Sequence, residues 1–277
     1  MLPLKSWGDK LIFGKLLKNG REYCKIKEKD FFRGNMGYLV LLAVLVAVYA
    51  LVICLMKYMR NRRVVNLVFA LLVFVPYACV VIKVYSDVGV NDWNFQNTLP
   101  VANVSPFCFA LVPISLVLPS FIRKRIYLLF TLLSVGMLMA AVLGCVYNAL
   151  IHYKFHFHFA LDYIAHISLS LWGIYFVKSG QVRLERKNAL FSGLIIVFVA
   201  TVMLILNLIL DTAFFGLSLR GKHNIYNNVL VDNSYLSALL YYIGLCGVLT
   251  LGYGFNRILN RRPTEKNAKI ETPCAIK

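Results

Sequence analysis

Seven long apolar stretches constrain this chain more than any other feature of its sequence. They run from Gly37 to Tyr58, Val64 to Ser86, Ser105 to Phe121, Ile126 to Ala149, Phe159 to Val177, Ala189 to Leu210 and Tyr235 to Ile258. A helix needs roughly 20 apolar residues to cross a bilayer, where every backbone polar group must be satisfied internally. The stretches lack the alternating polar face of barrel strands. The sequence therefore predicts an all-α fold, a polytopic membrane helical bundle of about seven transmembrane helices.

The remaining sequence divides into two basic ends around this membrane domain. Residues 1–36 interleave lysines with apolar side chains, which is typical of an interfacial amphipathic segment and equally of a solvated tail. Residues 37–258 form the predicted transmembrane domain, and residues 259–277 form a basic C-terminal tail. A hydrophobic content of 60% excludes a soluble globular domain.

The basic residues are concentrated in alternate loops. They follow the first, third, fifth and seventh stretches, at residues 57–63, 123–125, 178–187 and 257–262. The positive-inside rule predicts that these loops and the C-terminus are cytoplasmic in a multi-pass protein of the cell membrane. Seven crossings then place the basic N-terminal tail outside, which the same rule disfavours, and a re-entrant segment would remove the conflict.

The partners predicted from this charge are membrane lipids. The net charge is +18, but the basic side chains lie in short connectors near the expected headgroups, so nucleic acid is not expected. The seven cysteines form no C-x-x-C pair, and most lie inside apolar stretches. We therefore expect no disulfide framework, no zinc ribbon and no cofactor.

Two pairs of polar residues interrupt the apolar stretches at a helical spacing. Asp162 and His166 are four residues apart, as are Asn207 and Asp211, so each pair shares one face of a helix. An ionisable side chain at the centre of a bilayer costs about 2.5 to 3.5 kcal/mol on insertion scales. Such residues face one another or a wet cavity, and they indicate a site.

Other polar residues fall at helix ends that are predicted to lie on the same side of the membrane as the two pairs. Together with the two pairs, they predict one polar pocket in the leaflet opposite the basic loops. The alternative is that they act only as contacts between helices, which contribute about 0.6 kcal/mol each. The predicted substrate-binding residues are Asn103, Ser105, Asn148, His158, Asn207 and Asp211.

His166 is the predicted catalytic base of this pocket. An Asp162 carboxylate that accepts a ring N–H would orient a neutral imidazole for general-base work. His158, Asp162 and His166 are also a possible ligand set for a metal ion, although we assign no metal. Tyr235, Tyr241 and Tyr242, by contrast, are expected to be anchors at the membrane interface.

Three segments of the chain resemble the YwaF-like integral membrane proteins of bacteria. They are HFALDYIAHISLSLWGIYFVKSGQVR, NLILDTAFFGLSL and NTLPVANVSPF. That family is related to eukaryotic acyltransferases that move fatty acyl chains into ether phospholipids. The resemblance covers roughly residues 97–258 and implies a membrane bundle acting on lipid acyl groups.

The family motif is matched only in part. Leu99 and Pro100 match its Leu-Pro, and His166 matches the His of its fifth helix, but the His and Cys that follow Leu-Pro are replaced by residues 101–104. Cys108 lies one helical turn beyond Val104, and we take it as the candidate nucleophile on that spacing.

Three functions are therefore open at this stage. The first is transfer or hydrolysis of lipid acyl groups, with His166 as base, Asp162 orienting it, and Cys108 or Ser105 as nucleophile. The second is a transporter or binding protein for a lipid or small molecule that uses the same pocket without chemistry. The third is a metal-dependent lipid hydrolase.

Overall fold

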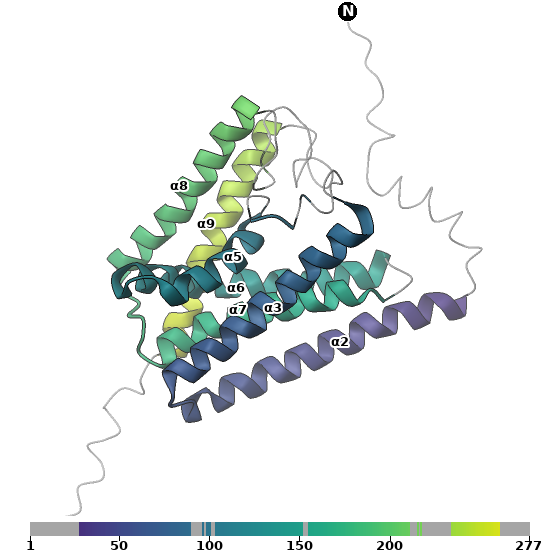
Figure 1. Ribbon diagram of the computed structural model, residues 1–277, viewed down its shortest axis with the longest axis horizontal. Helices are drawn as coiled ribbons and strands as arrows, with labels where there is room; N and C mark the ends of the chain where they lie inside the picture. The colour runs from purple at the N-terminus through teal and green to yellow at the C-terminus, as the bar shows by residue number, and fades with distance from the viewer. Residues whose placement is uncertain are drawn as a thin grey trace, which may run out of the picture.

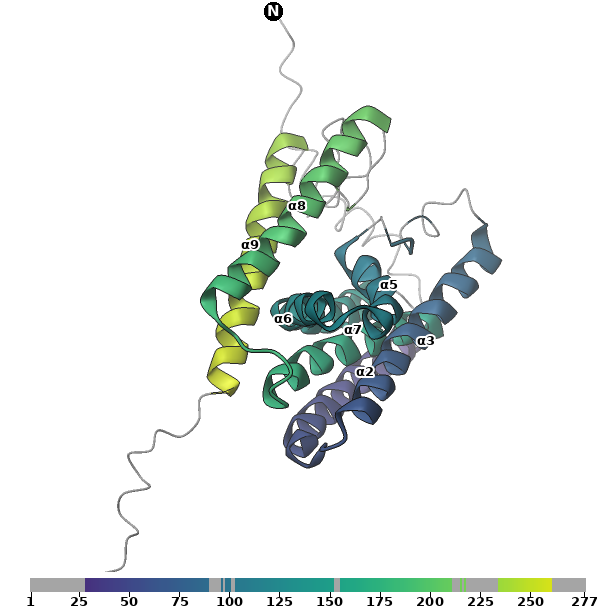
Figure 2. The same cartoon turned by 60° about the vertical axis from the view of Figure 1, so that its left-hand side comes forward.

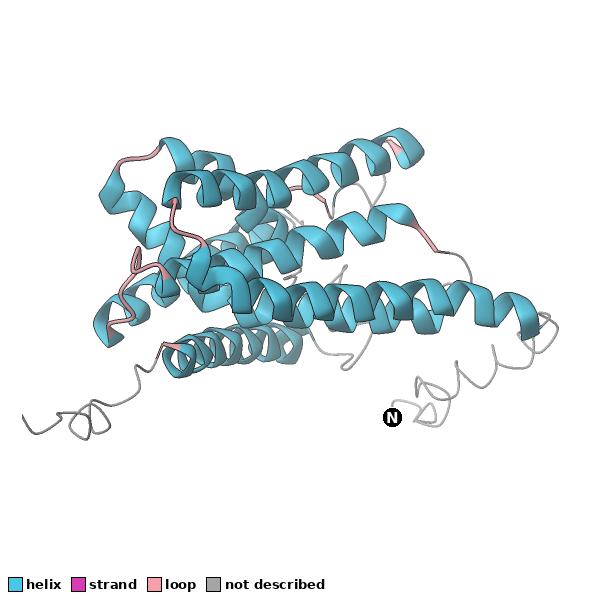
Figure 3. Ribbon diagram, turned by 90° about the horizontal axis from the view of Figure 1, so that it is seen from below, coloured by secondary structure: helices cyan, strands magenta, loops and turns pink. Residues whose placement is uncertain are grey.

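The computed structural model describes residues 28–89, 96, 98–100, 103–151, 155–210, 215, 217 and 234–260. Every regular element in these ranges is a helix, and none is a strand (Figure 3). The predicted all-α bundle of seven helices is therefore confirmed for the described residues.

Seven α-helices follow one another along the described chain. They are α2 (Glu28–Leu55), α3 (Arg62–Val88), α5 (Val104–Val117), α6 (Ser120–Ile151), α7 (Phe157–Lys178), α8 (Arg186–Leu210) and α9 (Ser234–Leu259), with one 3-10 turn, η2 (Met56–Tyr58), after α2. All except α5 are long and apolar enough to cross a membrane. The chain is a multi-pass membrane protein.

The third predicted span is shorter than the sequence indicated. Helix α5 has 14 residues, which at 1.5 Å each extend about 21 Å, less than the roughly 30 Å of a hydrocarbon core. It stops because Pro119 follows Leu118, whose φ of −71° and extended ψ of 153° are those of a residue before proline. Helix α6 then begins at Ser120, six residues earlier than predicted.

The first helix also differs from the prediction at its start. Helix α2 begins at Glu28, inside the segment predicted as a separate amphipathic unit, and its apolar part runs from Met36. The predicted boundary at residue 36 thus lies within one continuous helix. Residues 1–27 and 261–277 lie outside the described residues.

Helices α6 and α7 form the centre of the bundle. They pack as an antiparallel pair, with α2, α3 and α5 on one side and α9 with α8 on the other (Figures 1 and 2). Close contact between them depends on Gly173, where a Cβ would lie 2.6 Å from the Phe130 carbonyl oxygen. On the other side of α6, a Cβ at Gly252 of α9 would overlap the Leu132 carbonyl.

Buried hydrogen bonds fix these three helices to one another. Thr131 Oγ1 on α6 donates to the Gly173 carbonyl of α7 at 2.9 Å. From α9, the fully buried Asn256 donates Nδ2 to the Thr131 carbonyl at 3.0 Å and to Ser134 Oγ at 2.9 Å. Small residues and short polar side chains are the usual contacts between membrane helices.

The two ends of the bundle differ in shape and charge. At one end, where α2, α5, α7 and α9 finish, the connecting loops carry the basic residues of segments 57–63, 123–125 and 178–187, and we name it the basic end. At the opposite, distal end the helices diverge, with α8 and α9 pointing away from α2 and α3 (Figure 1). Although α5 is short, it runs back to the basic end, so successive helices alternate in direction. Because α9 ends at the basic end and there are seven described helices, α2 begins at the distal end.

Candidate functional site

His166 lies on the inner face of α7 and is almost completely buried, at 7% exposure. Its Nδ1 is 2.8 Å from the backbone carbonyl oxygen of Asp162 and 3.5 Å from the carboxylate Oδ1 of the same residue. A carbonyl oxygen can only accept, so Nδ1 carries a proton and donates in this contact, and in the neutral ring Nε2 is the nitrogen with the lone pair. The predicted pair is therefore brought together, but the backbone carbonyl is the closer acceptor.

The ring of His166 is held from α5 by an aromatic contact. The Phe109 ring meets it edge-on, with centroids 4.9 Å apart. Phe109 in turn packs on Tyr77 of α3 at 5.4 Å, and Tyr77 Oη donates to the Thr98 carbonyl at 2.8 Å. A row of rings thus runs from α3 through α5 to α7, and it ties the segment that contains Leu99 to the bundle.

Cys108 is adjacent to this row but is not joined to His166. Its side chain is fully buried, and within the described residues no hydrogen bond links its thiol to the imidazole. The residue that meets the imidazole is its neighbour Phe109, and consecutive side chains on a helix point about 100° apart. The nucleophile role of Cys108 stays a prediction.

The two buried asparagines are each engaged elsewhere. Asn148 of α6 donates Nδ2 to Tyr163 Oη on α7, and Asn207 of α8 donates Nδ2 to the backbone carbonyl of Leu217. Gly144 makes room for the Tyr163 ring, because a Cβ there would lie 2.8 Å from a ring carbon. The Asn148 contact matches the alternative in which polar residues connect helices, whereas Asn207 ties α8 to a residue outside the helices.

The other predicted site residues are distributed along the distal half of the bundle. Asn103 is half-buried just before α5, and its side chain makes no capping hydrogen bond. His158 is half-buried beside Phe159, with ring centroids 4.2 Å apart. Asp211 lies outside the described residues.

Ser105 opens onto a cavity between α5, α6 and α9, which we name the central cavity. Its volume is about 180 Å³, and its walls are mainly aliphatic. Its polar groups are the hydroxyls of Ser105 and Tyr241. The lining residues are Val104, Ser105, Leu133, Gly136, Met137, Tyr241, Gly244, Leu245 and Val248.

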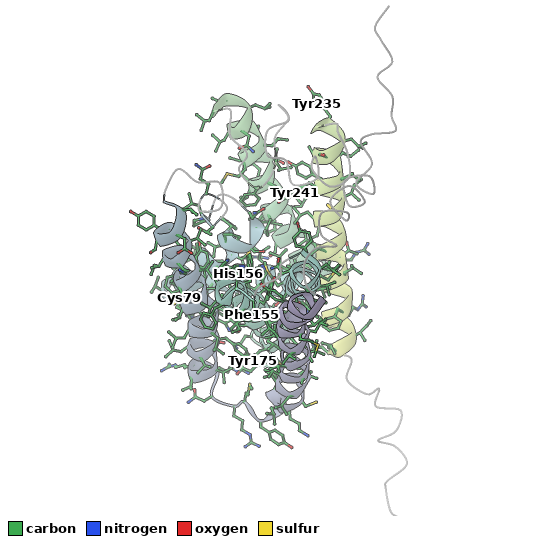
Figure 4. All side chains as sticks on the ribbon, turned by 90° about the vertical axis from the view of Figure 1, so that its right-hand side faces the viewer. Cys79, Phe155, His156, Tyr175, Tyr235 and Tyr241 are labelled. Carbon is green, nitrogen blue, oxygen red and sulfur yellow. The ribbon has the colours of Figure 1, made fainter. Side chains whose placement is uncertain are left out.

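The role predicted for Tyr241 as an interface anchor is wrong. Its ring is buried, at 8% exposure, because α9 turns this face toward α5 and α6. Tyr235 is 72% exposed, as expected of an anchor. Figure 4 shows Tyr235 at the tip of α9 and Tyr241 further in along the same helix.

A metal site does not form among the described side chains. No group of three or more His, Cys, Asp or Glu residues converges there in a way that would hold an ion. The row of His158, Asp162 and His166 therefore offers no ligand cluster for a metal-dependent hydrolase within this part of the chain.

Comparison with known proteins does not identify a family or a function for this site. No family model, curated protein or solved structure matches the chain. Similarity to YwaF-like proteins stays a prediction that rests on the short motifs. In the fold, two of those motifs lie near each other, because Thr98 is tied through Tyr77 and Phe109 to His166.

Sequence reasoning missed the central cavity because its walls carry few polar groups. Gly136 and Gly244 were a usable signal, since each is a glycine near the middle of an apolar stretch, where it weakens a helix unless close packing or space requires it. The contact of Tyr163 with Asn148 was not predicted, because the polar pattern of this stretch was assigned to Asp162 and His166 alone.

Proposed function

We propose that the protein binds the acyl chain of a membrane lipid in the central cavity, as a lipid-binding or lipid-transporting protein. One observation carries this proposal: a mainly aliphatic cavity lies beside the first turn of a helix that is too short to span the membrane. Apolar pockets with few, well-placed polar groups are typical ligand sites.

The depth of the cavity supports a ligand taken from the bilayer. Its walls on α6 (residues 133–137) and on α9 (residues 241–248) come from the middle of those helices. Val104 and Ser105 of α5 reach the same level, so α5 begins near mid-membrane rather than at the distal surface. Transporters commonly place substrate sites beside such interrupted helices.

The first turn of α5 supplies polar contacts for the head of an acyl chain. Its leading N–H groups have no partner within the helix, and Asn103 does not cap them with its side chain. The positive end of the helix dipole and the Ser105 hydroxyl suit a carboxylate or an ester carbonyl. Pro106 lacks an N–H and so removes one unsatisfied donor from this turn.

The size of the cavity indicates which part of a lipid it accommodates. A volume of about 180 Å³ is below the roughly 300 to 1,000 Å³ of sites that enclose drug-sized ligands. The cavity therefore suits part of one acyl chain, while the rest of the lipid stays in the bilayer.

A matched pair of tryptophan substitutions on α9 tests this proposal. Leu245 lines the cavity, whereas Leu251 is 56% exposed on the lipid-facing surface. A palmitate analogue with a diazirine on its chain should label peptides around Met137 in the wild-type protein. We expect Leu245→Trp to reduce that labelling at least tenfold, because the indole fills the space, and Leu251→Trp to leave it unchanged. Equal labelling in all three proteins would reject the cavity as the binding site.

Transfer or hydrolysis of acyl groups is the second candidate function. It is favoured by the hydrogen bond from His166 Nδ1 to the Asp162 carbonyl, which leaves Nε2 able to accept a proton. If His166 is a general base, His166→Gln should slow the release or transfer of a fluorescent acyl chain from a phospholipid about 100-fold or more. The control is His156→Gln, at the exposed histidine just before the same helix. A His166→Gln protein that retains the wild-type rate would exclude this role.

A further inference from the structure

A second cavity lies at the basic end of the bundle, far along α7 from His166. Its volume is about 430 Å³, and it forms where η2, the start of α3, the end of α7 and the end of α9 meet. We name it the basic cavity. Its polar lining consists of Lys57, Arg60, Arg62, Lys178, Ser179 and Asn260.

The described charges around this cavity are all of one sign. Among the residues that the structure describes, four cationic side chains line it and no carboxylate does. None of the four takes part in an ion pair within the described residues, and the nearby carboxylate Glu185 accepts a hydrogen bond from Asn188. A cleft lined by charges of one sign concentrates counter-ions, because the field is focused between its low-dielectric walls.

One of these cations, Arg62, lies at a helix end where positive charge is unfavourable. Arg62 is the first residue of α3 and Arg60 precedes it by two, and the first turn of α3 contains no acidic residue. The N-terminus of a helix carries a partial positive charge, so cations there are unfavourable and anions are stabilised by about 0.3 to 1 kcal/mol. An anion in the cavity would offset both the helix dipole and the arginines.

One of the lysines has an alternative role. Lys178 lies at the C-terminal end of α7 and its Nζ is 3.5 Å from the Ile53 carbonyl, as expected of a cation near unpaired helix carbonyls. That explanation does not extend to Arg62, which is the first residue of α3. Arg62, with Arg60 two residues before it, therefore carries the inference.

The walls of the cavity are held in place by side chains of α7 and of the loop that follows it. Tyr175 Oη donates to the Met59 carbonyl at 3.1 Å, and Gln181 Nε2 donates to Ser179 Oγ at 3.0 Å. Gly180, with φ of +70°, makes the tight turn that follows α7, and a Cβ there would lie 4.0 Å from Arg62 Nη2. The guanidinium of Arg62 thus reaches from α3 to the loop after α7.

A half-buried network of hydrogen bonds next to the cavity supports this arrangement. Trp172 Nε1 donates to Asn66 Oδ1 at 3.1 Å, and Asn66 Nδ2 donates to Gln181 Oε1 at 2.8 Å. Gln181 is the residue that positions Ser179. Preorganised walls lower the ordering cost of binding a ligand.

We propose that the basic cavity binds a phosphate group, with Arg60 and Arg62 as its main contacts. Arginine presents paired N–H donors that match phosphate oxygens, and basic pockets between membrane helices bind anionic lipid headgroups. The phosphate belongs to a lipid headgroup or to a soluble phosphate compound, and both share this chemistry. The inference does not depend on the central cavity or on His166.

Two double variants of equal charge test the site in the purified full-length chain. R60Q/R62Q removes the two arginines of the cavity, and R183Q/R186Q removes two exposed arginines at the same end that do not line it. The probes are phosphatidylglycerol in neutral detergent, phosphatidylcholine as the zwitterionic control, and inorganic phosphate. Binding is followed by native mass spectrometry and by the shift in Tm.

R60Q/R62Q should weaken binding of phosphatidylglycerol roughly 30-fold, since each basic side chain near an anionic group contributes about 1 kcal/mol and 1.4 kcal/mol is tenfold. R183Q/R186Q should bind like the wild-type protein, and R60K/R62K should recover part of the loss.

Comparable binding of inorganic phosphate would identify a soluble source, and binding of phosphatidylglycerol alone would identify a lipid. Equal losses in the two Gln double variants would overturn the proposal, because binding would then follow total charge. A monodisperse R60Q/R62Q protein with wild-type Tm in the absence of ligand excludes misfolding.

Discussion

Helices α7 and α8 are neighbours in sequence and similar in length, yet they occupy opposite environments. Helix α7 is the least apolar of the six long helices, and 78% of its span is buried within the protein. Helix α8 is far more apolar, and only 17% of its span is buried. In a bilayer the most apolar helix faces lipid, whereas the helix with the most polar groups lies at the centre.

The reason for this difference is the supply of hydrogen-bond partners. On α7, Ser170 Oγ lies 3.0 Å from Tyr49 Oη of α2, and Trp172 donates to Asn66 of α3. On α8, the exposed Thr201 donates to the Val197 carbonyl of its own helix and accepts only an exposed contact from Tyr242 of α9. Polar groups on α7 are matched by neighbouring helices, which explains how α7 can hold a buried His166 as well.

The largest expected effect comes from removing an aromatic ring from each helix. Phe176 on α7 is fully buried, whereas Phe198 on α8 is 68% exposed. We expect Phe176→Ala to cost about 3 kcal/mol, the low end for soluble cores, because packing is lost but little transfer energy is. Phe198→Ala should change stability by less than about 0.5 kcal/mol. Reversible unfolding in mixed detergent measures both, and equal losses would contradict the assigned environments.

Adding a methyl group to a glycine on each helix should give the next largest difference. At Gly173 of α7 the new Cβ would lie 2.6 Å from the Phe130 carbonyl oxygen, whereas at Gly193 of α8 it would meet only Leu249 at an ordinary 3.6 Å. Gly173→Ala should destabilise the protein by roughly 2 kcal/mol through overpacking. Gly193→Ala should be neutral or stabilising by up to about 1 kcal/mol, because alanine favours the helix. A Gly173→Ala protein with unchanged Tm would show that α6 and α7 are further apart than described.

The smallest expected effect concerns single hydrogen bonds between helices. The buried Tyr49–Ser170 contact should show a coupling energy of about 0.6 kcal/mol in a double-mutant cycle of Tyr49→Phe with Ser170→Ala. The exposed contact from Tyr242 to Thr201, at 3.2 Å, should couple more weakly in the matching cycle. A stronger coupling at the exposed pair would mean that burial does not set the strength of these contacts.

The helices were predictable because lipid imposes a length and a composition on them. Six predicted spans correspond to helices α2, α3, α6, α7, α8 and α9, with ends that differ by up to nine residues. The third was predicted as a full span because apolar residues continue on both sides of Pro119. Composition alone does not reveal that the chain turns there and that the residues after it belong to α6.

The site was less predictable, since spacing along a helix does not determine which neighbour a side chain meets. The pairing of Asp162 with His166 follows from the four-residue spacing, and in the structure His166 Nδ1 contacts the Asp162 carbonyl oxygen and lies 3.5 Å from its carboxylate. The contacts of Asn148 with Tyr163 and of Asn207 with Leu217 depend on how separate helices are rotated. The same holds for Asn66, Gln181 and the arginines of the basic cavity, which local patterns treat as ordinary loop residues.

Asn256 imposes an order on the assembly of the bundle. Its buried amide nitrogen is satisfied by Thr131 and Ser134, both on α6, and α9 is the last helix of the described chain. During synthesis α6 and α7 are made first and are adjacent, so they can associate before α9 leaves the ribosome. The last of the described helices therefore docks onto a surface already formed, and its Asn256 adds a second donor to the Thr131 carbonyl, which Ser134 Oγ contacts within α6.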